Sequence, residues 1–185
     1  MSDPSDETEW ADAARGDGEA FGRIFDRHRD RVFRHSLRLV PTASDADDVV
    51  AVAFLEAWRR RQQLRFVDGS MLPWLLVTAT NAAHNLSRAS RRYRALLARL
   101  PVDEHAADHA DLYDQGEAHV ALRSLSLTDQ QVVSLCILQG YSERDAAAAL
   151  GVPAGTVKSR LSRAKRRLAD QLTPTTFQKE APHEL

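Results

Sequence analysis

The stretch YSERDAAAALGVPAGTVKSRLSRAKRRL, residues 141–168, decides the fold of the C-terminal part of this chain. It predicts two helices separated by a turn at Gly151, because a residue without a Cβ tolerates a positive φ. Ser142 is a good N-cap for the first helix. Six of the ten residues 158–167 are basic. A basic helix alone is most simply a solvated amphipathic helix, but the break, the spacing and the charge together are typical of a helix-turn-helix that binds DNA.

The second helix of this pair has one apolar stripe. Pro153 suits its first turn, where a backbone N–H is not needed. The stripe recurs at steps of four, three and four residues, at Val157, Leu161, Ala164 and Leu168. The outward faces are left to polar and basic residues: Lys158, Ser159, Ser162, Arg163, Lys165 and Arg166. We therefore expect the stripe to pack on the domain core and the basic faces to meet DNA.

Charge is strongly segregated along the 185 residues, although the net charge is only −1. The net charge is −6 for residues 1–20, +8 for 21–100, −6 for 101–118, +4 for 119–172 and −1 for the remainder. Two basic blocks separated by an acidic one indicate two modules and a linker, so the near-neutral total does not exclude nucleic acid as a partner.

Helical periodicity dominates, and no convincing strand alternation is present. We expect an all-α chain of two small helical domains joined by a flexible acidic linker, the C-terminal domain being the helix-turn-helix. The expected segments are a disordered acidic leader (1–15), an N-terminal domain (16–98), the linker (99–117), the C-terminal domain (118–172) and a mobile tail (173–185).

In the N-terminal domain, the pattern predicts a first helix that begins near Phe21 and ends before Pro41. A second helix is expected to open at Ser44, with Asp47 in a short capping box. A third is expected to start at Pro73. In the C-terminal domain we expect helices near 118–124, 128–138, 142–150 and 153–170.

The third helix carries a second group of candidate binding residues. Asn81, Asn85, Arg88 and Arg92 are spaced i, i+4, i+7 and i+11, which places them along one face. Phe66 precedes the helix and Trp74 lies at its start. Amides, guanidinium groups and aromatic rings on one surface suit unpaired bases, although a solvated polar face has the same pattern.

Other classes of function have little support. Cys136 lies in an apolar run and is expected to be a small buried hydrophobe in a reducing compartment. No apolar run reaches the roughly 18 residues of a membrane span, and the N-terminus lacks a signal-peptide pattern, so we expect a soluble, cytoplasmic protein without membrane insertion. A metalloenzyme built on His105, His109 and His119 lacks a convincing third ligand, and no catalytic nucleophile motif occurs. We expect neither an enzyme, a metal site nor a cofactor.

Three segments in order resemble the extracytoplasmic-function (ECF) group of bacterial RNA polymerase sigma factors. SDADDVVAVAFLEAWRR (44–60) resembles the helix that binds the polymerase clamp. LPWLLVTATNAAHNLSRASRR (72–92) resembles the helix that recognises and opens the −10 promoter element. LTDQQVVSLCILQGYSERDAAAALGVPAGTVKSRLSRAKRRL (127–168) resembles the helix-turn-helix that reads the −35 element. The resemblance covers over four-fifths of the chain.

The resemblance implies a role for individual residues. Polymerase binding falls on Asp47, Asp48, Ala51, Phe54 and Trp58, although Phe54 and Trp58 also fit a core. Reading of the −10 strand falls on Phe66, Asn81, Asn85, Arg88 and Arg92, with the loop 64–70 capturing a flipped base. Reading of the −35 element falls on Thr156, Lys158, Ser159, Arg160, Ser162, Arg163 and Arg166. Ala51 and Thr80 depart from the family pattern: Gln is frequent at the first position, in the polymerase-binding helix, and Arg at the second, next to the residues that contact the −10 strand.

The resemblance thus implies an alternative sigma factor that binds core RNA polymerase through its clamp helices and directs initiation at specific promoters. Promoter DNA and an anti-sigma factor are the further partners it implies. The acidic linker is a candidate mimic of nucleic acid or a segment that folds back on a basic face. The alternative is a stand-alone helix-turn-helix regulator, but residues 21–100 show no receiver or ligand-sensor pattern.

Overall fold

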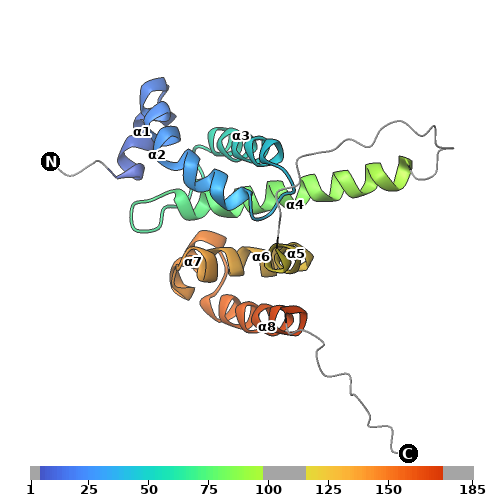
Figure 1. Cartoon of the computed structure of the whole chain (residues 1–185). Helices are drawn as coiled ribbons and strands as arrows, with labels where there is room; N and C mark the ends of the chain where they lie inside the picture. The colour runs from blue at the N-terminus through green and yellow to red at the C-terminus, as the bar shows by residue number, and fades with distance from the viewer. Residues whose placement is uncertain (1–4, 98–115, 173–185) are drawn as a thin grey trace, which may run out of the picture.

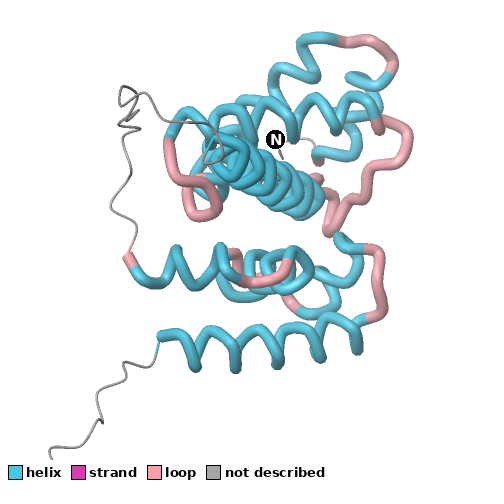
Figure 2. Tube along the Cα trace, turned by 90° about the vertical axis from the view of Figure 1, so that its right-hand side faces the viewer, coloured by secondary structure: helices cyan, strands magenta, loops and turns pink. Residues whose placement is uncertain are grey.

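A computed structural model describes residues 5–97 and 116–172, and in these ranges every regular element is a helix (Figures 1 and 2). This agrees with the expected all-α class. The N-terminal helices are α1 (Asp6–Ala14), α2 (Gly18–Ser36), α3 (Ala43–Arg59) and α4 (Leu72–Leu97). The C-terminal elements are α5 (Glu117–Ser124), α6 (Leu127–Val133), the π-helical turn η1 (Ser134–Leu138), α7 (Glu143–Leu150) and α8 (Ala154–Leu172). Among these described helices, none has the length and apolarity of a membrane span.

The expectation of a disordered leader over 1–15 is wrong for residues 6–14, which form helix α1. Ser5 caps this helix by accepting a hydrogen bond from the Thr8 amide, and acidic residues occupy its positive first turn. Trp10 and Ala13 are buried, and the Trp10 ring lies 6.0 Å from the ring of Phe21. The buried acids Asp6 and Glu9 pair with Arg23 and Arg27 of α2, so the acidic composition that suggested disorder is compensated by charge.

Helices α2, α3 and α4 enclose the core of the N-terminal domain. The apolar stripe expected for α3 is buried at Val49, Val50, Ala53 and Ala57. The helix begins at Ala43 and its N-cap is Thr42, two residues before the expected Ser44, because Thr42 has an extended backbone and its side chain accepts a hydrogen bond from the Asp45 amide at 3.0 Å. Thr42 also donates to the Asp45 carboxylate, so the capping box lies two residues earlier than predicted.

The C-terminal helices agree closely with the predicted spans, with one difference. The helix expected over 128–138 changes to π-helical hydrogen bonding at Ser134–Leu138. Such turns insert an extra residue per turn and re-aim the side chains that follow. Here the π-helical turn includes Leu135, which is buried.

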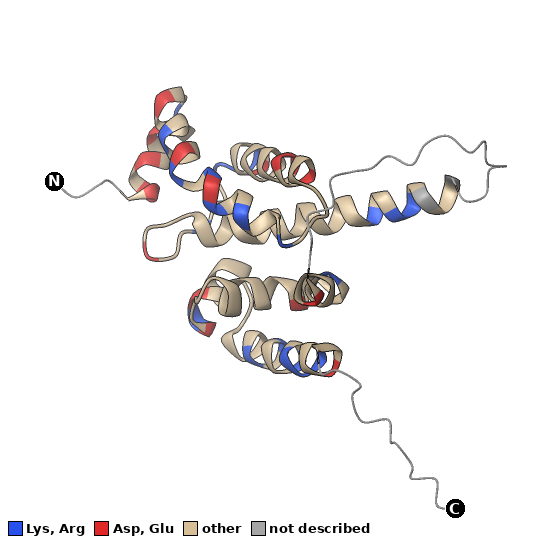
Figure 3. Ribbon diagram, viewed as in Figure 1, with Lys and Arg blue, Asp and Glu red and all other residues tan. Residues whose placement is uncertain are grey.

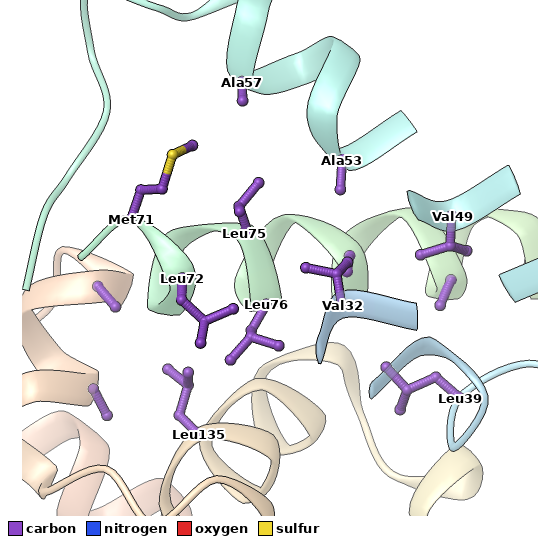
Figure 4. Packing of buried hydrophobic residues seen from close by; sticks show 14 of the residues in the cluster. Val32, Leu39, Val49, Ala53, Ala57, Met71, Leu72, Leu75, Leu76 and Leu135 are labelled. Atoms are coloured by element: carbon purple, nitrogen blue, oxygen red, sulfur yellow. The ribbon is translucent and has the colours of Figure 1, made fainter. Parts of the chain in front are cut away.

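The two domains pack against each other around α4. One continuous cluster of buried apolar residues includes members of both domains. Leu135 of η1 points at Leu72 and Leu76 of α4 (Figure 4). Polar contacts flank this seam: Gln131 Nε2 donates to Asn81 Oδ1 at 2.7 Å, and Arg31 donates to the Gln139 side chain at 3.4 Å. The described structure is therefore a closed arrangement of the two domains.

Candidate nucleic-acid and protein interfaces

The C-terminal candidate site is a helix-turn-helix formed by α7 and α8. Ser142 caps α7 through the Asp145 amide at 3.1 Å. Gly151 has φ 66° and ψ 39°, and its N–H closes the helix on the Ala147 carbonyl at 2.8 Å. Both features confirm the sequence analysis. The left-handed Gly151 turns the chain so that α8 crosses α7 through the small residues Ala146 and Ala149, which are buried.

Helix α8 separates an inner apolar face from an outer basic one, as predicted. Its stripe is buried at Val157, Leu161 and Ala164. Five of the seven candidate −35 residues are exposed: Lys158, Ser159, Ser162, Arg163 and Arg166. The basic residues stand out along α8 in Figure 3. The other two, Thr156 and Arg160, are half-buried, and Arg160 lines a cleft that faces α4.

The N-terminal candidate site is the polar face of α4. Asn85, Arg88 and Arg92 are exposed, while Asn81 is half-buried and accepts the hydrogen bond from Gln131. Burial lowers the pKa of His84 on the same helix, and Arg88 and Arg91 lower it further. The C-terminal half of α4 therefore presents a positive surface to solvent (Figure 3).

A cleft of about 750 Å³ separates this face from the C-terminal domain. Its N-terminal wall includes Trp74, Asn81 and Asn85, and its opposite wall includes Gln131 and Arg160. The α3–α4 loop reaches across to α7, and the Arg65 guanidinium fills the space that a Cβ at Gly151 would occupy. The predicted −10 and −35 residues thus meet at this cleft through Asn81, Asn85 and Arg160, while the remaining exposed residues of α8 lie away from it.

Thr80, which departs from the family pattern, lies in the core. Its side chain is fully buried, its hydroxyl donates to the Leu76 carbonyl at 2.8 Å, and His35 Nε2 lies 3.0 Å from the same hydroxyl. Burial lowers the pKa of His35 to about 4, with a further contribution from the charge of Arg38. Thr80 is therefore a structural residue, and in this arrangement its side chain does not face the surface that carries Asn85.

The α3–α4 loop (residues 60–71) contains the predicted base-capturing segment. Phe66 is half-buried against the core, while Arg65 and Asp68 are exposed. Val67 and Ser70 are joined by two backbone hydrogen bonds of 2.9 and 3.0 Å. The segment is thus an ordered turn with one aromatic ring partly available.

The outer face of α3 is the candidate protein interface. Asp47, Asp48, Ala51 and Trp58 are exposed, in agreement with the expected surface. Phe54 is 3% exposed and its ring lies 4.7 Å from that of Phe25, so its assignment to polymerase contact is wrong and it belongs to the core. The period of an α-helix turns position 54 inward with Val50 and Ala57.

Sequence reasoning missed two residues of this face. Val52 is 48% exposed and Leu55 57% exposed. With Asp48 and Ala51 they form a continuous strip at i, i+3, i+4 and i+7. The signal was present, since large aliphatic side chains on the face opposite a core stripe are typical of an interface.

Metal binding gains no support from the described ranges, in which no group of three or more His, Cys, Asp or Glu side chains comes together. His105 and His109 lie outside the described residues, as does most of the acidic linker. Cys136 is half-buried, and burial raises the pKa of its thiol.

Comparison with known proteins gives two family matches. Residues 24–93 match the model described as "Sigma-70 region 2", and residues 115–168 match "Sigma-70, region 4". The chain is 36% identical over 159 residues to ECF RNA polymerase sigma factor SigM of Mycobacterium tuberculosis, covering 83% of this chain and 78% of that protein. It is 30% identical to RNA polymerase sigma factor NccH of Alcaligenes xylosoxydans xylosoxydans, covering 91% and 95%.

Two solved structures share the fold. CnrH in complex with the cytosolic domain of CnrY superposes with a TM-score of 0.62 at 27% identity, covering 90% of this chain and 96% of that one. The sigma factor RpoE of Bartonella quintana, in complex with the anti-sigma factor NepR, superposes with a TM-score of 0.55 at 27% identity, covering 84% and 98%.

Proposed function

Because this chain belongs to the sigma-70 family, in the ECF group of RNA polymerase sigma factors, we propose that each of its three exposed surfaces performs one step of promoter-specific initiation. The chain acts as an alternative sigma factor: it binds core RNA polymerase and directs it to promoters. The polymerase performs the chemistry. The two family regions in one chain favour this function over a stand-alone helix-turn-helix regulator.

The observation that carries the residue assignments is the outer face of α8. Five polar and basic side chains on one exposed surface follow a capped helix and a left-handed turn. Such a helix enters the major groove, where Arg and Ser side chains pair with base edges and phosphates. We assign Lys158, Ser159, Ser162, Arg163 and Arg166 to the −35 element.

We assign the face of α4 to the −10 element. The amides of Asn81 and Asn85 pair with edges of unstacked bases, and Arg88 and Arg92 neutralise the adjoining phosphates. The exposed strip of α3, now with Val52 and Leu55, is assigned to the polymerase clamp. Its aliphatic side chains supply buried apolar area and its aspartates supply charge complementarity.

The closed arrangement has a functional consequence. In the position described here Asn81 is half-buried and its Oδ1 accepts a hydrogen bond from Gln131, an interaction that competes with pairing to a base. The C-terminal domain therefore has to move off α4 before the −10 strand is read. The similar sigma factor RpoE is in complex with the anti-sigma factor NepR, and CnrH is in complex with the cytosolic domain of CnrY. A protein that binds and holds the two domains is therefore an expected regulator of this chain too.

Transcription in vitro with purified core polymerase tests these assignments. On a duplex promoter, we expect Arg163→Ala to reduce −35-dependent initiation and Asn81→Ala to reduce initiation through opening. A pre-melted template should restore a larger part of the transcription lost in Asn81→Ala than of that lost in Arg163→Ala. Arg29→Ala, which removes an exposed charge from α2, is the control. Equal defects of Asn81→Ala on duplex and pre-melted templates would contradict its role in opening.

A further inference from the structure

Helix α1 contacts both ends of the loop that joins α3 to α4. Trp10 Nε1 donates to the Arg61 carbonyl at 3.0 Å, where the loop begins. The Asp6 carboxylate accepts from the Ser70 hydroxyl and from the Met71 amide, each at 2.9 Å, where the loop ends. A helix distant in sequence thus holds the loop at two points more than fifty residues away.

The Asp6 carboxylate is itself fixed by charge. It is 4% exposed; Arg27 donates to its Oδ1 at 2.8 Å, and His28 Nε2 lies 2.7 Å from its Oδ2. Burial alone would raise the pKa of Asp6, but the hydrogen bonds from His28, Arg27 and Met71 outweigh burial and hold it well below its ordinary value. Asp6 is therefore ionised at neutral pH, and both of its oxygens act as hydrogen-bond acceptors.

The tip of the loop is held as well. Asp68 and Gly69 have φ values of 50° and 74°, and positive φ at both central positions is the signature of a type I′ turn between Val67 and Ser70. The Glu7 amide donates to the Gly69 carbonyl at 3.3 Å. A Cβ at Gly69 would lie 3.3 Å from the Ser5 Cβ, so the turn is seated directly against the start of α1.

We propose that α1 is a brace for the α3–α4 loop, in which Asp6 and Trp10 are positioning residues that set base discrimination in the −10 strand. The proposal rests on the assignment of this loop to a flipped base. A loop that is already ordered pays little conformational entropy on binding, and a rigid wall can reject a base of the wrong shape. Asp6 and Trp10 touch no DNA themselves; they fix the backbone on either side of Phe66.

Four variants separate this role from general stability. Asp6→Ala removes the acceptor at the end of the loop, and Trp10→Phe keeps an aromatic ring in the core but removes the hydrogen bond to Arg61. Asp6→Asn retains an oxygen for Ser70 and Met71 but turns an amide donor toward Arg27, so it should lose less function than Asp6→Ala. Asp12→Ala alters an exposed ion pair with Arg15 on the same helix and is the matched control.

The first measurement uses each variant assembled with core polymerase and a randomised single-stranded DNA pool. For Asp6→Ala and Trp10→Phe, we expect about threefold to tenfold weaker binding of the sequences that wild type selects. The enrichment at one base position should flatten, while core affinity stays at the wild-type level. Unchanged base enrichment, or a parallel loss of core affinity, overturns the proposal, as does an equal effect of Asp12→Ala.

The second measurement needs no DNA and is therefore independent of the proposed function. Hydrogen exchange at the amides of Val67 and Ser70 reports the turn in the free chain. We expect faster exchange in Asp6→Ala, a smaller increase in Asp6→Asn and wild-type exchange in Asp12→Ala. Unchanged exchange in Asp6→Ala refutes the brace. If wild-type holoenzyme enriches no base although these amides respond as expected, the role of the loop is wrong and the brace stands as a structural device only.

Discussion

Replacing Gln131 with alanine removes a single hydrogen bond between the two domains. Its amide donates to Asn81 Oδ1 at 2.7 Å, and both residues line the cleft, so water can solvate the Asn81 oxygen after the change. The loss is then that of one neutral hydrogen bond, about 0.5–1.5 kcal/mol. This shifts the equilibrium between closed and open domains by about twofold to thirteenfold toward the open form.

The same factor should appear in DNA binding. If only the open form reads the −10 strand, the apparent affinity of a predominantly closed protein rises in proportion to the open population. We therefore expect Gln131→Ala to bind a single-stranded −10 oligonucleotide about twofold to thirteenfold more tightly than wild type, in the free state. In the holoenzyme, where the −10 strand is read and this hydrogen bond is already broken, no such gain is expected.

Fluorescence anisotropy with an oligonucleotide from a promoter mapped by transcript start sites measures this change. Small-angle X-ray scattering on the same samples should show a larger radius of gyration. Gln171→Ala is the matched control, because it removes a Gln hydrogen bond of 2.9 Å to Ser124 inside the C-terminal domain. Unchanged affinity and radius of gyration in Gln131→Ala, or the same gain in Gln171→Ala, would refute the reasoning.

Three further predictions follow from burial and charge. Phe54→Ala should lower the free energy of unfolding, measured by urea titration, by about 3–5 kcal/mol, because Phe54 is buried. Leu55 is exposed, so Leu55→Ala should change this free energy by less than about 0.5 kcal/mol. The same variant should weaken binding to core polymerase about fivefold or more. His35 has a pKa of about 4 when folded, so the unfolded chain takes up the proton first and stability should fall by up to about 3 kcal/mol as the pH drops from 6.5 to 4. His35→Gln should flatten the stability curve between pH 6.5 and 4. Asp6 does not affect this range, because its lowered pKa means that its contribution to stability is lost only as the pH falls below its ordinary pKa of 3.8. Arg163→Ala should reduce the slope of log affinity for −35 duplex DNA against log salt concentration by about one, and a wild-type slope would exclude a phosphate contact.

Local patterns predicted the C-terminal domain well, because its determinants are local. Ser142, Gly151 and Pro153 each act within one turn of the chain, and the stripe from Val157 depends only on helical period. These local signals do not depend on contacts with residues that are distant in the sequence. The same reasoning misplaced the cap of α3, since Thr42 and Ser44 are both good caps and only the backbone conformation distinguishes them.

Long-range contacts explain what the sequence did not reveal. Residues 6–14 read as a disordered leader because their acids look solvated, yet Asp6 and Glu9 are buried against Arg27, an arginine about twenty residues away. Phe54 looked equally suited to a core or an interface until α2 brought Phe25 against it. The contact between Asn81 and Gln131 joins two domains and has no signature in either segment.

The two proposed DNA-binding surfaces, on α4 and on α8, differ in exposure in the closed arrangement. On α4, Asn81 is engaged and the adjoining face borders the cleft, whereas most of the outer face of α8 lies exposed on the far side of its domain (Figures 1 and 3). Opening of the domains should thus change affinity for the −10 strand and leave affinity for −35 duplex nearly constant. Any partner that stabilises the closed form would accordingly block strand opening more strongly than promoter recognition. Release from such a partner should then permit opening of the −10 strand, whereas the recognition helix α8 is exposed both before and after release.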